Sequence, residues 1–320
     1  MASANSTFTE LVSTTFRKHR KEIKDNVSNR NAFLKYMQKR GNMRKEDGGL
    51  TIACPLDYAE NGTYQRYSDW DTLDISQSDV ISAAEFQWRQ IALNVVASGR
   101  ELRINSGDSR IINLAKARIK NALRTFNNNF SSDLYSAGSL SNQINGLQAI
   151  IADTNTNTVG GIDANTWTFW RNTVRDASDQ SVTVSATTIE NGMMLPLWLE
   201  LDRGPDDQPD LIVMDNTWFA YFESSQVSLK RYNDRGTADA GFTTLKYKNA
   251  DVMFDGNSGI PTTHMYFINT NYFELVVHEQ ADLEIMEEMR PVNQDGAVIP
   301  ILWMGNVTCS NRKRQGVGKA

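Results

Sequence analysis

The strongest hydrophobic pattern in the chain runs from Asp108 to Leu134, where apolar residues recur at three- and four-residue spacing. This spacing places them on one face of an α-helix, with basic residues on the opposite face. The apolar positions are Ile111, Ile112, Ala115, Ile119, Ala122, Leu123, Phe126, Phe130 and Leu134. At about 1.5 Å per residue the helix would be about 40 Å long. We therefore predict a spine helix rather than a short connection.

Apolar positions before this helix predict two helices and two strands. Helical patterns cover Phe8–Glu22 and Arg30–Arg40. Leu50–Leu56 alternates as a half-buried strand does, and a matching strand returns at Phe86–Ala97. The apolar phase slips partway along the returning strand, which indicates a bulge or a bend.

The second half of the chain mixes helices and strands. Thr187–Glu190 has capping-box spacing and predicts the start of a helix that continues to Leu201. Asp210–Met214 reads as a buried strand, after which Asp215 is placed to cap a short helix. Further strands are predicted at Thr243–Tyr247, Val252–Phe254, Met265–Ile268 and Tyr272–Val277, and a hairpin from Leu283–Met289 and Ala297–Met304. The pattern predicts an α+β chain with two peripheral arms.

One of these arms is the long connection Asp57–Asp79. It holds six acidic residues against the single cation Arg66, a net charge of −5, together with Tyr58, Tyr64, Tyr67 and Trp70. A connection of this length is usually functional or disordered. Disordered segments are poor in aromatic residues, so we predict an ordered arm that is buried against another surface.

The other arm is basic. Residues 1–48 carry eleven Lys and Arg against five Asp and Glu, a local charge of +6, although the whole chain has a net charge of −5. Such a segment is either a solvated tail or a contact with an acidic partner, such as nucleic acid or an acidic patch on a protein. The candidate contact residues are Arg17, Lys18, Arg20, Lys21 and Lys24.

Composition excludes several classes of function. The chain is 40% hydrophobic, which is enough for a globular core, but no stretch approaches the roughly 20 apolar residues of a membrane span. Its two cysteines lie far apart and it has three histidines, so neither a disulfide framework nor a zinc site is expected. The glycine-rich phosphate and dinucleotide motifs and the common hydrolase motifs are absent. We expect no enzymatic activity, cofactor, metal or membrane contact.

An unusual stretch at Thr158–Asn172 leaves one alternative open. A Gly160-Gly161 step precedes Trp167 and Trp170, which are spaced to share one face of a short helix. The two rings could pack a domain, or they could form a substrate platform in a glycan-active enzyme that uses Asp163 and Asp176. We favour packing.

Many segments resemble the major capsid proteins of tailed bacteriophages, in the same order along the chain. They are Gly49–Leu56, Tyr58–Asn61, Ser82–Trp88, Gly146–Ala152, Val159–Asp163, Trp167–Asn172, Pro209–Asp215, Phe254–Gly256, Gly259–Pro261 and Met265–Asn269. The resemblance covers nearly the whole chain from about residue 30. Each motif is weak alone, and their shared order carries the resemblance.

The resemblance implies the Hong Kong 97-type capsid fold common to tailed phages and herpesviruses. Its four parts would be a basic N-terminal arm (1–48), an extended loop with its two strands (49–104), a peripheral domain with the spine helix (105–145 and 273–302) and an axial domain (146–272 and 303–320). Tyr58, Tyr64, Arg66, Tyr67 and Trp70 would contact neighbouring subunits. Gly160 and Gly161 would lead into the axial domain, and Trp167 and Trp170 would pack it.

The implied function is structural. Such a chain would self-assemble into hexamers and pentamers of an icosahedral head that encloses double-stranded DNA, bound without sequence specificity. It would be assembled in the host bacterial cytoplasm and reside in the virion, with a portal and scaffolding or decoration proteins as further partners. An encapsulin-like compartment shell is an alternative. Some relatives join subunits by lysine–asparagine bonds, but no lysine occurs between Lys45 and Lys116, so that chemistry is expected to be missing.

Overall fold

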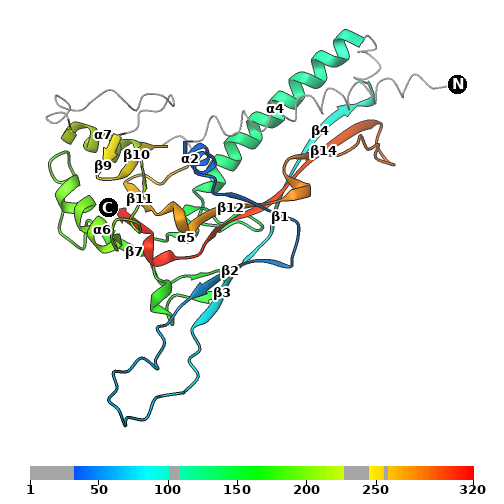
Figure 1. Ribbon diagram of the computed structural model, residues 1–320. Coiled ribbons are helices and arrows are strands. Elements are labelled where there is room, and N and C mark those ends of the chain that lie inside the picture. Colours follow the sequence, from blue (N-terminus) through cyan, green and yellow to red (C-terminus); the bar gives the residue numbers. More distant parts are fainter. Residues whose placement is uncertain (1–31, 101–107, 227–244, 256–258) are drawn as a thin grey trace.

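The computed structural model describes residues 32–100, 108–226, 245–255 and 259–320. Two mixed sheets form its centre, a long helix extends from one end, and a loop projects from its base (Figure 1). The predicted α+β class is confirmed. The helix predicted at Phe8–Glu22 and the basic candidates Arg17, Lys18, Arg20, Lys21 and Lys24 lie outside the described residues.

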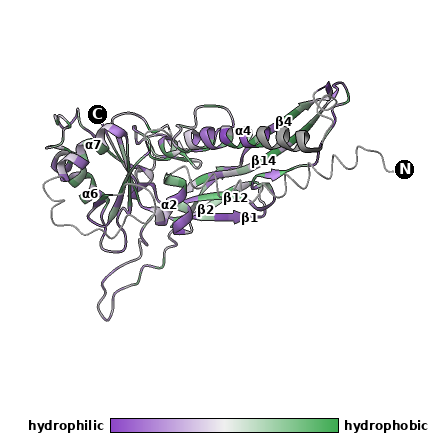
Figure 2. Cartoon of the chain, turned by 90° about the horizontal axis from the view of Figure 1, so that it is seen from above, coloured by the Kyte–Doolittle hydropathy of each residue, from purple (hydrophilic) through white to green (hydrophobic). Residues whose placement is uncertain are grey.

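The spine helix is α4 (Asp108–Leu134), with the bounds that the apolar periodicity predicts. It lies along the two longest strands, β4 (Arg89–Ser98) and β14 (Gly296–Cys309) (Figure 2). Phe126 and Phe130 stack with their ring centroids 5.2 Å apart, and Phe130 meets Trp303 of β14 edge-on at 5.0 Å. Burial of this aromatic face fixes the helix to the sheet.

The five-stranded sheet is organised around β14. One edge of β14 pairs antiparallel with the whole of β4, from Gly296 opposite Ser98 to Gly305 opposite Arg89. The other edge pairs with β13 (Glu284–Ile285) and then with β12 (Phe273–His278), and β1 (Met43–Glu46) lies parallel to β12. The predicted hairpin thus forms, but its first strand is interrupted after Ile285, and pairing resumes at the bridge between Met289 and Val298 with the register shifted by one residue.

The strand predicted at Phe86–Ala97 is wrong as a single element. It divides at Trp88 into β3 (Ile81–Gln87), which pairs with β2 (Thr51–Asp57), and β4, which joins the five-stranded sheet. The predicted break in apolar phase marks the division. Trp88 donates its indole N–H to Gly49 O at 3.0 Å. This bond fixes the side chain at the point where the chain passes from the two-stranded sheet β2-β3 to the five-stranded sheet.

The six-stranded sheet has the order β7-β15-β11-β8-β10-β9. These strands are β7 (Thr173–Asp176), β8 (Leu211–Met214), β9 (Leu245–Tyr247), β10 (Ala250–Phe254), β11 (His264–Ile268) and β15 (Gly316–Lys319). Every residue of β8 is buried, as its continuous apolar run predicts. The helices α6 (Leu195–Leu201) and α7 (Asn216–Ser225) pack against this sheet and form a second core through Trp198, Trp218 and Phe222.

Two helix starts test the predicted caps. Asp215 accepts hydrogen bonds from the backbone N–H groups of Thr217 and Trp218, so its predicted role at α7 is confirmed. The capping box at Thr187–Glu190 is wrong, because the Thr187 hydroxyl bonds to the Ser185 hydroxyl at 3.1 Å and Glu190 accepts from Ser225 Oγ. The chain enters α6 through a π-helical turn, η2 (Ile189–Met194), instead.

The N-terminal described helix, α2 (Ala32–Arg40), joins the two sheets. Phe33 packs against Tyr135 and Phe273, with ring centroids 6.1 and 5.9 Å away. Arg40 forms an ion pair with Asp210 at 2.9 Å. The remaining short elements are α5 (Leu147–Ile150), β5 (Thr158–Val159), β6 (Ile162–Asp163), η1 (Thr168–Trp170), η5 (Thr270–Tyr272), η6 (Glu279–Ala281) and η7 (Arg312–Arg314).

The described part of the chain contains neither a helix suited to cross a membrane nor a cluster of three or more His, Cys, Asp or Glu that could hold a metal. Three carboxylates of the acidic turn 202–210, which follows α6, already have partners within the chain. Asp202 accepts from Gly204 N, Asp207 from Asn269, and Asp210 pairs with Arg40. Cys54 and Cys309 are both buried and free.

Candidate functional site

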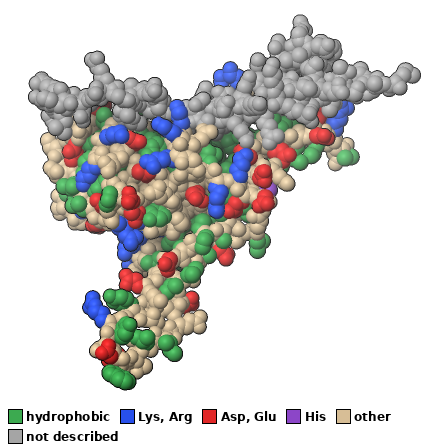
Figure 3. Space-filling view, viewed as in Figure 1, with side chains coloured by type: hydrophobic (Ala, Val, Ile, Leu, Met, Phe, Trp, Pro, Cys, Tyr) green, Lys and Arg blue, Asp and Glu red, His purple; other side chains and the backbone are tan. Residues whose placement is uncertain are grey.

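The extended loop leaves its large side chains uncovered. Tyr64, Tyr67 and Trp70 are 80%, 69% and 97% exposed, and the loop adds exposed Leu73 and Ile75. Hydrophobic side chains gather toward the far end of the projecting segment (Figure 3). Exposed apolar patches of this kind mark surfaces that bind another molecule.

Local polar bonds give the loop its shape without a core. Ser68 N–H donates to Asp71 Oδ2 at 2.8 Å, Asp71 N–H donates to Ser68 O at 2.9 Å, and Gln65 Nε2 donates to Thr72 O at 3.0 Å. These bonds fold the tip into a turn that holds Trp70 outward. Arg66, the one cation of the segment, is exposed beside it.

The base of the loop, in contrast, is packed against the chain's own body. The ring of Tyr58 lies 5.7 Å from the rings of both Trp167 and Phe169. Glu85 of β3 donates its N–H to Gly160 O at 2.9 Å. Of the five loop residues predicted to contact a neighbour, Tyr58 therefore differs from the others, because its ring is already held within the chain.

Gly160 and Gly161 form the turn between β5 and β6, with φ of +59° and +76°. Positive φ at both central residues is the geometry of a tight hairpin turn that glycine adopts without strain. A Cβ atom at Gly160 would also lie 2.9 Å from the Cβ of Ala84. The glycine step therefore brings this turn against β3 and sets the direction in which the loop leaves the body.

The two tryptophans have different environments. Trp170 is 1% exposed and donates its indole N–H to Val159 O at 2.9 Å, so it is a packing residue. Trp167 is 48% exposed and contacts Tyr58 and Phe169. We predicted that both tryptophans pack the domain. Trp170 does so, whereas about half of the Trp167 side chain remains exposed.

The structure does not support the alternative of a glycan-active enzyme. Hydrogen bonds from Asn165 N–H and Thr166 lower the pKa of Asp163, and the bond to Lys319, together with Ser178 N–H, lowers the pKa of Asp176. A glycosidase needs one carboxylic acid whose pKa is raised. Because Trp170 is buried, the two tryptophans do not form an exposed platform for a sugar.

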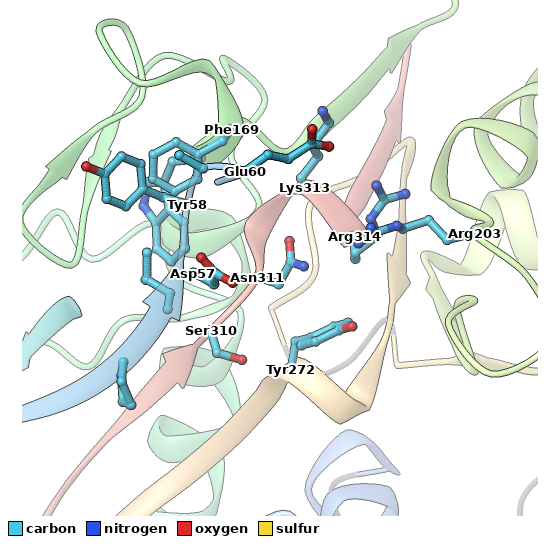
Figure 4. Close-up of a pocket in the computed structure, with 14 residues that line it drawn as sticks. Asp57, Tyr58, Glu60, Phe169, Arg203, Tyr272, Ser310, Asn311, Lys313 and Arg314 are labelled. Carbon is cyan, nitrogen blue, oxygen red and sulfur yellow. The ribbon is translucent and has the colours of Figure 1, made fainter. Parts of the chain in front are cut away.

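A cavity of about 640 Å³ lies where β2 enters the loop (Figure 4). Tyr58 and Phe169 line one side, and the cations Arg203, Lys313 and Arg314 lie opposite. Burial and then the charge of Arg203 lower the pKa of Arg314. The carboxylates of Asp57 and Glu60 line the same cavity, and Arg203 forms an ion pair with Asp207 at 3.7 Å, so the lining carries both signs of charge.

Sequence reasoning missed this cavity with its three cations, although the run Arg312–Arg314 was a signal. Its first member is structural, since Arg312 is fully buried and donates to Ile150 O, to Asn157 and to Asn172. The turn η7 that Arg312 anchors then directs the next two cations toward the loop base. Only the fold separates these roles.

Comparison with solved structures identifies the architecture. The chain is similar to the capsid asymmetric unit of cyanophage A-1(L), with 14% identity over 87% of this chain and 90% of that chain and a TM-score of 0.65. It is also similar to the capsid of an empty GTA particle (11% identity, 88% of each chain, TM-score 0.57) and to a structure of Mycobacterium phage Bobi (8% identity, 88% and 89%, TM-score 0.55).

No protein-family model matches the sequence, and neither does any curated protein. At such low identities the likeness concerns the backbone architecture. The chain has the major capsid fold of tailed phages, as the resemblance in sequence predicts.

Proposed function

We propose that the chain is a structural major capsid protein, which self-assembles into hexamers and pentamers of an icosahedral phage head around double-stranded DNA. The observation that carries the proposal is the loop. On a capsid fold, it projects three aromatic side chains that the described part of one chain leaves uncovered. A neighbouring subunit would cover them, since burying apolar area drives association.

The partners and location follow from this role. The main partner is the chain itself, and a portal and scaffolding or decoration proteins would complete the head. Packaged DNA would be bound without sequence specificity, and the basic arm would face it or a neighbouring subunit. Assembly would take place in the host bacterial cytoplasm, and the product would reside in the virion.

We also propose the division into four parts that the family resemblance implies: an arm (1–48), an extended loop (49–104), a peripheral domain (105–145 and 273–302) and an axial domain (146–272 and 303–320). The presence of two separate sheets supports a peripheral and an axial part. A core cluster that includes residues of both sheets joins them, and a second cluster packs α6 and α7 on the six-stranded sheet.

The test is to express the chain and to examine it by light scattering and negative-stain microscopy. Hexamers, pentamers or closed shells are expected at micromolar concentration, and an obligate monomer would contradict the proposal. Particles from infected cells should contain nuclease-protected DNA. Particles filled with enzyme cargo would instead indicate an encapsulin-like shell, and a monomer that binds saccharides would indicate the glycan-active alternative.

A further inference from the structure

A second cavity, of about 570 Å³, lies beside β3 at the loop base. It is a groove between the outer edge of β3, the Gly160-Gly161 turn and the half-exposed ring of Trp167. The cavity described above lies beside β2 instead. The lining of the cavity beside β2 carries both signs of charge, whereas the charged residues that line the groove beside β3 are all acidic.

The groove beside β3 is acidic. Its lining includes Asp79, Glu85 and Asp163, and no Lys, Arg or His. Hydrogen bonds from Asn165 and Thr166 lower the pKa of Asp163, so this carboxylate stays ionised. Asp79 and Glu85 are exposed, and the described residues provide no ion pair for either. The face of a tryptophan ring attracts cations as well, so the groove favours a positively charged occupant.

The edge of β3 also favours an extended occupant. One edge of the strand pairs with β2 over its full length. At the other edge, the described part of the chain provides the single backbone bond from Glu85 N–H to Gly160 O. Open strand edges bind extended segments by backbone pairing, while side pockets select the side chains.

The chain itself contains a segment with this chemistry. Residues 17–24 hold five Lys and Arg against one acidic residue, in a sequence whose total charge is −5. The other dense basic run, Arg312–Arg314, is folded into η7 and its first arginine is buried. The segment 17–24 is therefore the better of the two candidates to supply several cations to the groove.

A second copy is the source that the fold favours. The helix α2, which follows the basic segment, is held by Phe33 against Tyr135 and by Arg40 against Asp210. Figure 1 shows α2 above β12, whereas β3 lies below it. A segment of the same chain would have to pass around the sheet to reach the groove, but an adjacent chain in an assembly would not.

We propose that the acidic groove along β3 binds the basic segment, residues 17–24, of a second copy of this chain. The proposal rests on the proposed function, because it requires an assembly. It assigns the basic arm a protein partner rather than DNA. Its contacts are the carboxylates of Asp79, Glu85 and Asp163 and the ring of Trp167.

Cysteine cross-linking tests the contact. One chain carries Lys21→Cys and a second carries Glu85→Cys; both native cysteines are buried and remain as they are. The chains are co-assembled and oxidised with copper–phenanthroline. A reducible pair at twice the 36.0 kDa of one chain is expected. The matched control replaces Glu85→Cys with Glu200→Cys, an equally charged and exposed position on α6.

The outcomes separate the two proposals. Normal particles that give no pair from Glu85→Cys, or as much from Glu200→Cys, would overturn the groove assignment. A bond within one chain, in a variant that carries both Lys21→Cys and Glu85→Cys, would overturn the second copy as its source. Failure of the unmodified chain to assemble would count against the proposed function.

Charge reversal gives an independent measurement. Asp79→Lys with Glu85→Lys should lower particle yield at least tenfold, and adding Arg20→Glu with Lys21→Glu should restore at least half of it. Asp179→Lys with Glu200→Lys, at exposed sites outside the groove, should leave the yield unchanged. If the arm lies on DNA instead, reversal in the groove will have no effect, and reversal in the arm will reduce packaged DNA without rescue.

Discussion

Trp70 and Trp170 form a matched pair for separating folding from assembly. Both are tryptophans in the same chain, but Trp70 is 97% exposed at the loop tip and Trp170 is 1% exposed beneath the loop base. The same substitution, to alanine, should therefore act on two different equilibria. Trp70→Ala should impair assembly, and Trp170→Ala should impair folding.

The magnitudes follow from burial. Truncating a buried tryptophan costs about 3–5 kcal/mol, and the loss of the indole donor to Val159 O adds about 1 kcal/mol. An exposed substitution stays within about 0.5 kcal/mol of the original stability. If a neighbour buries Trp70, each contact is worth about 1.5–3 kcal/mol, which becomes about 9–18 kcal/mol over the six equivalent loops of a hexamer.

The assay compares unassembled subunits with particles. Denaturant unfolding followed by circular dichroism should give Trp70→Ala an unchanged midpoint and Trp170→Ala a strongly lowered one. Sedimentation and negative-stain microscopy should then find few or unstable shells from Trp70→Ala, while Trp70→Phe keeps most of the yield. The reasoning is refuted if Trp70→Ala destabilises the subunit, or if its shells match the original in yield and heat resistance.

Three further outcomes are expected. Because no lysine occurs between Lys45 and Lys116, particles should dissociate in boiling detergent to single chains of 36.0 kDa, and a ladder of covalent multimers would contradict this. Asp215→Ala should lower the free energy of unfolding by about 2 kcal/mol, because it leaves the N–H groups at the start of α7 without their acceptor, while Asp215→Asn should cost less. His264 Nε2 and Asp153 Oδ2 lie 3.1 Å apart. Burial opposes the charged form of His264, but its hydrogen bonds to Asp153 and to the Thr262 carbonyl leave the pKa of His264 raised. The hydrogen bond to His264 also lowers the pKa of Asp153. The stability that His264 supplies should be complete below its ordinary pKa of about 6.5 and decline as the pH rises through the raised value. The difference in unfolding midpoint between the original chain and Asp153→Asn should therefore shrink as the pH rises above about 6.5.

Local signals in the sequence determined the elements that depend on near neighbours. The helix α4 has its predicted bounds because its apolar spacing alone defines one long face, and Asp215 caps α7 because an aspartate at that position satisfies the free N–H groups of the next turn. The burial of β8 follows from its continuous apolar run. The uncovered loop aromatics also follow from composition, since so acidic a segment cannot form its own core.

Tertiary structure decided everything that depends on residues far apart in the chain. The strand after Trp88 pairs with β14 rather than with β2, because partner choice is set by sheet edges that are about 200 positions away in sequence. Glu190 leaves the predicted capping box because Ser225 of α7 lies within hydrogen-bond reach. Trp167 and Trp170 look equivalent in sequence, but the Gly160 turn closes over one ring and leaves the other half exposed. Propensity and spacing describe a residue's neighbours along the chain, whereas burial and charge pairing depend on which distant surfaces meet.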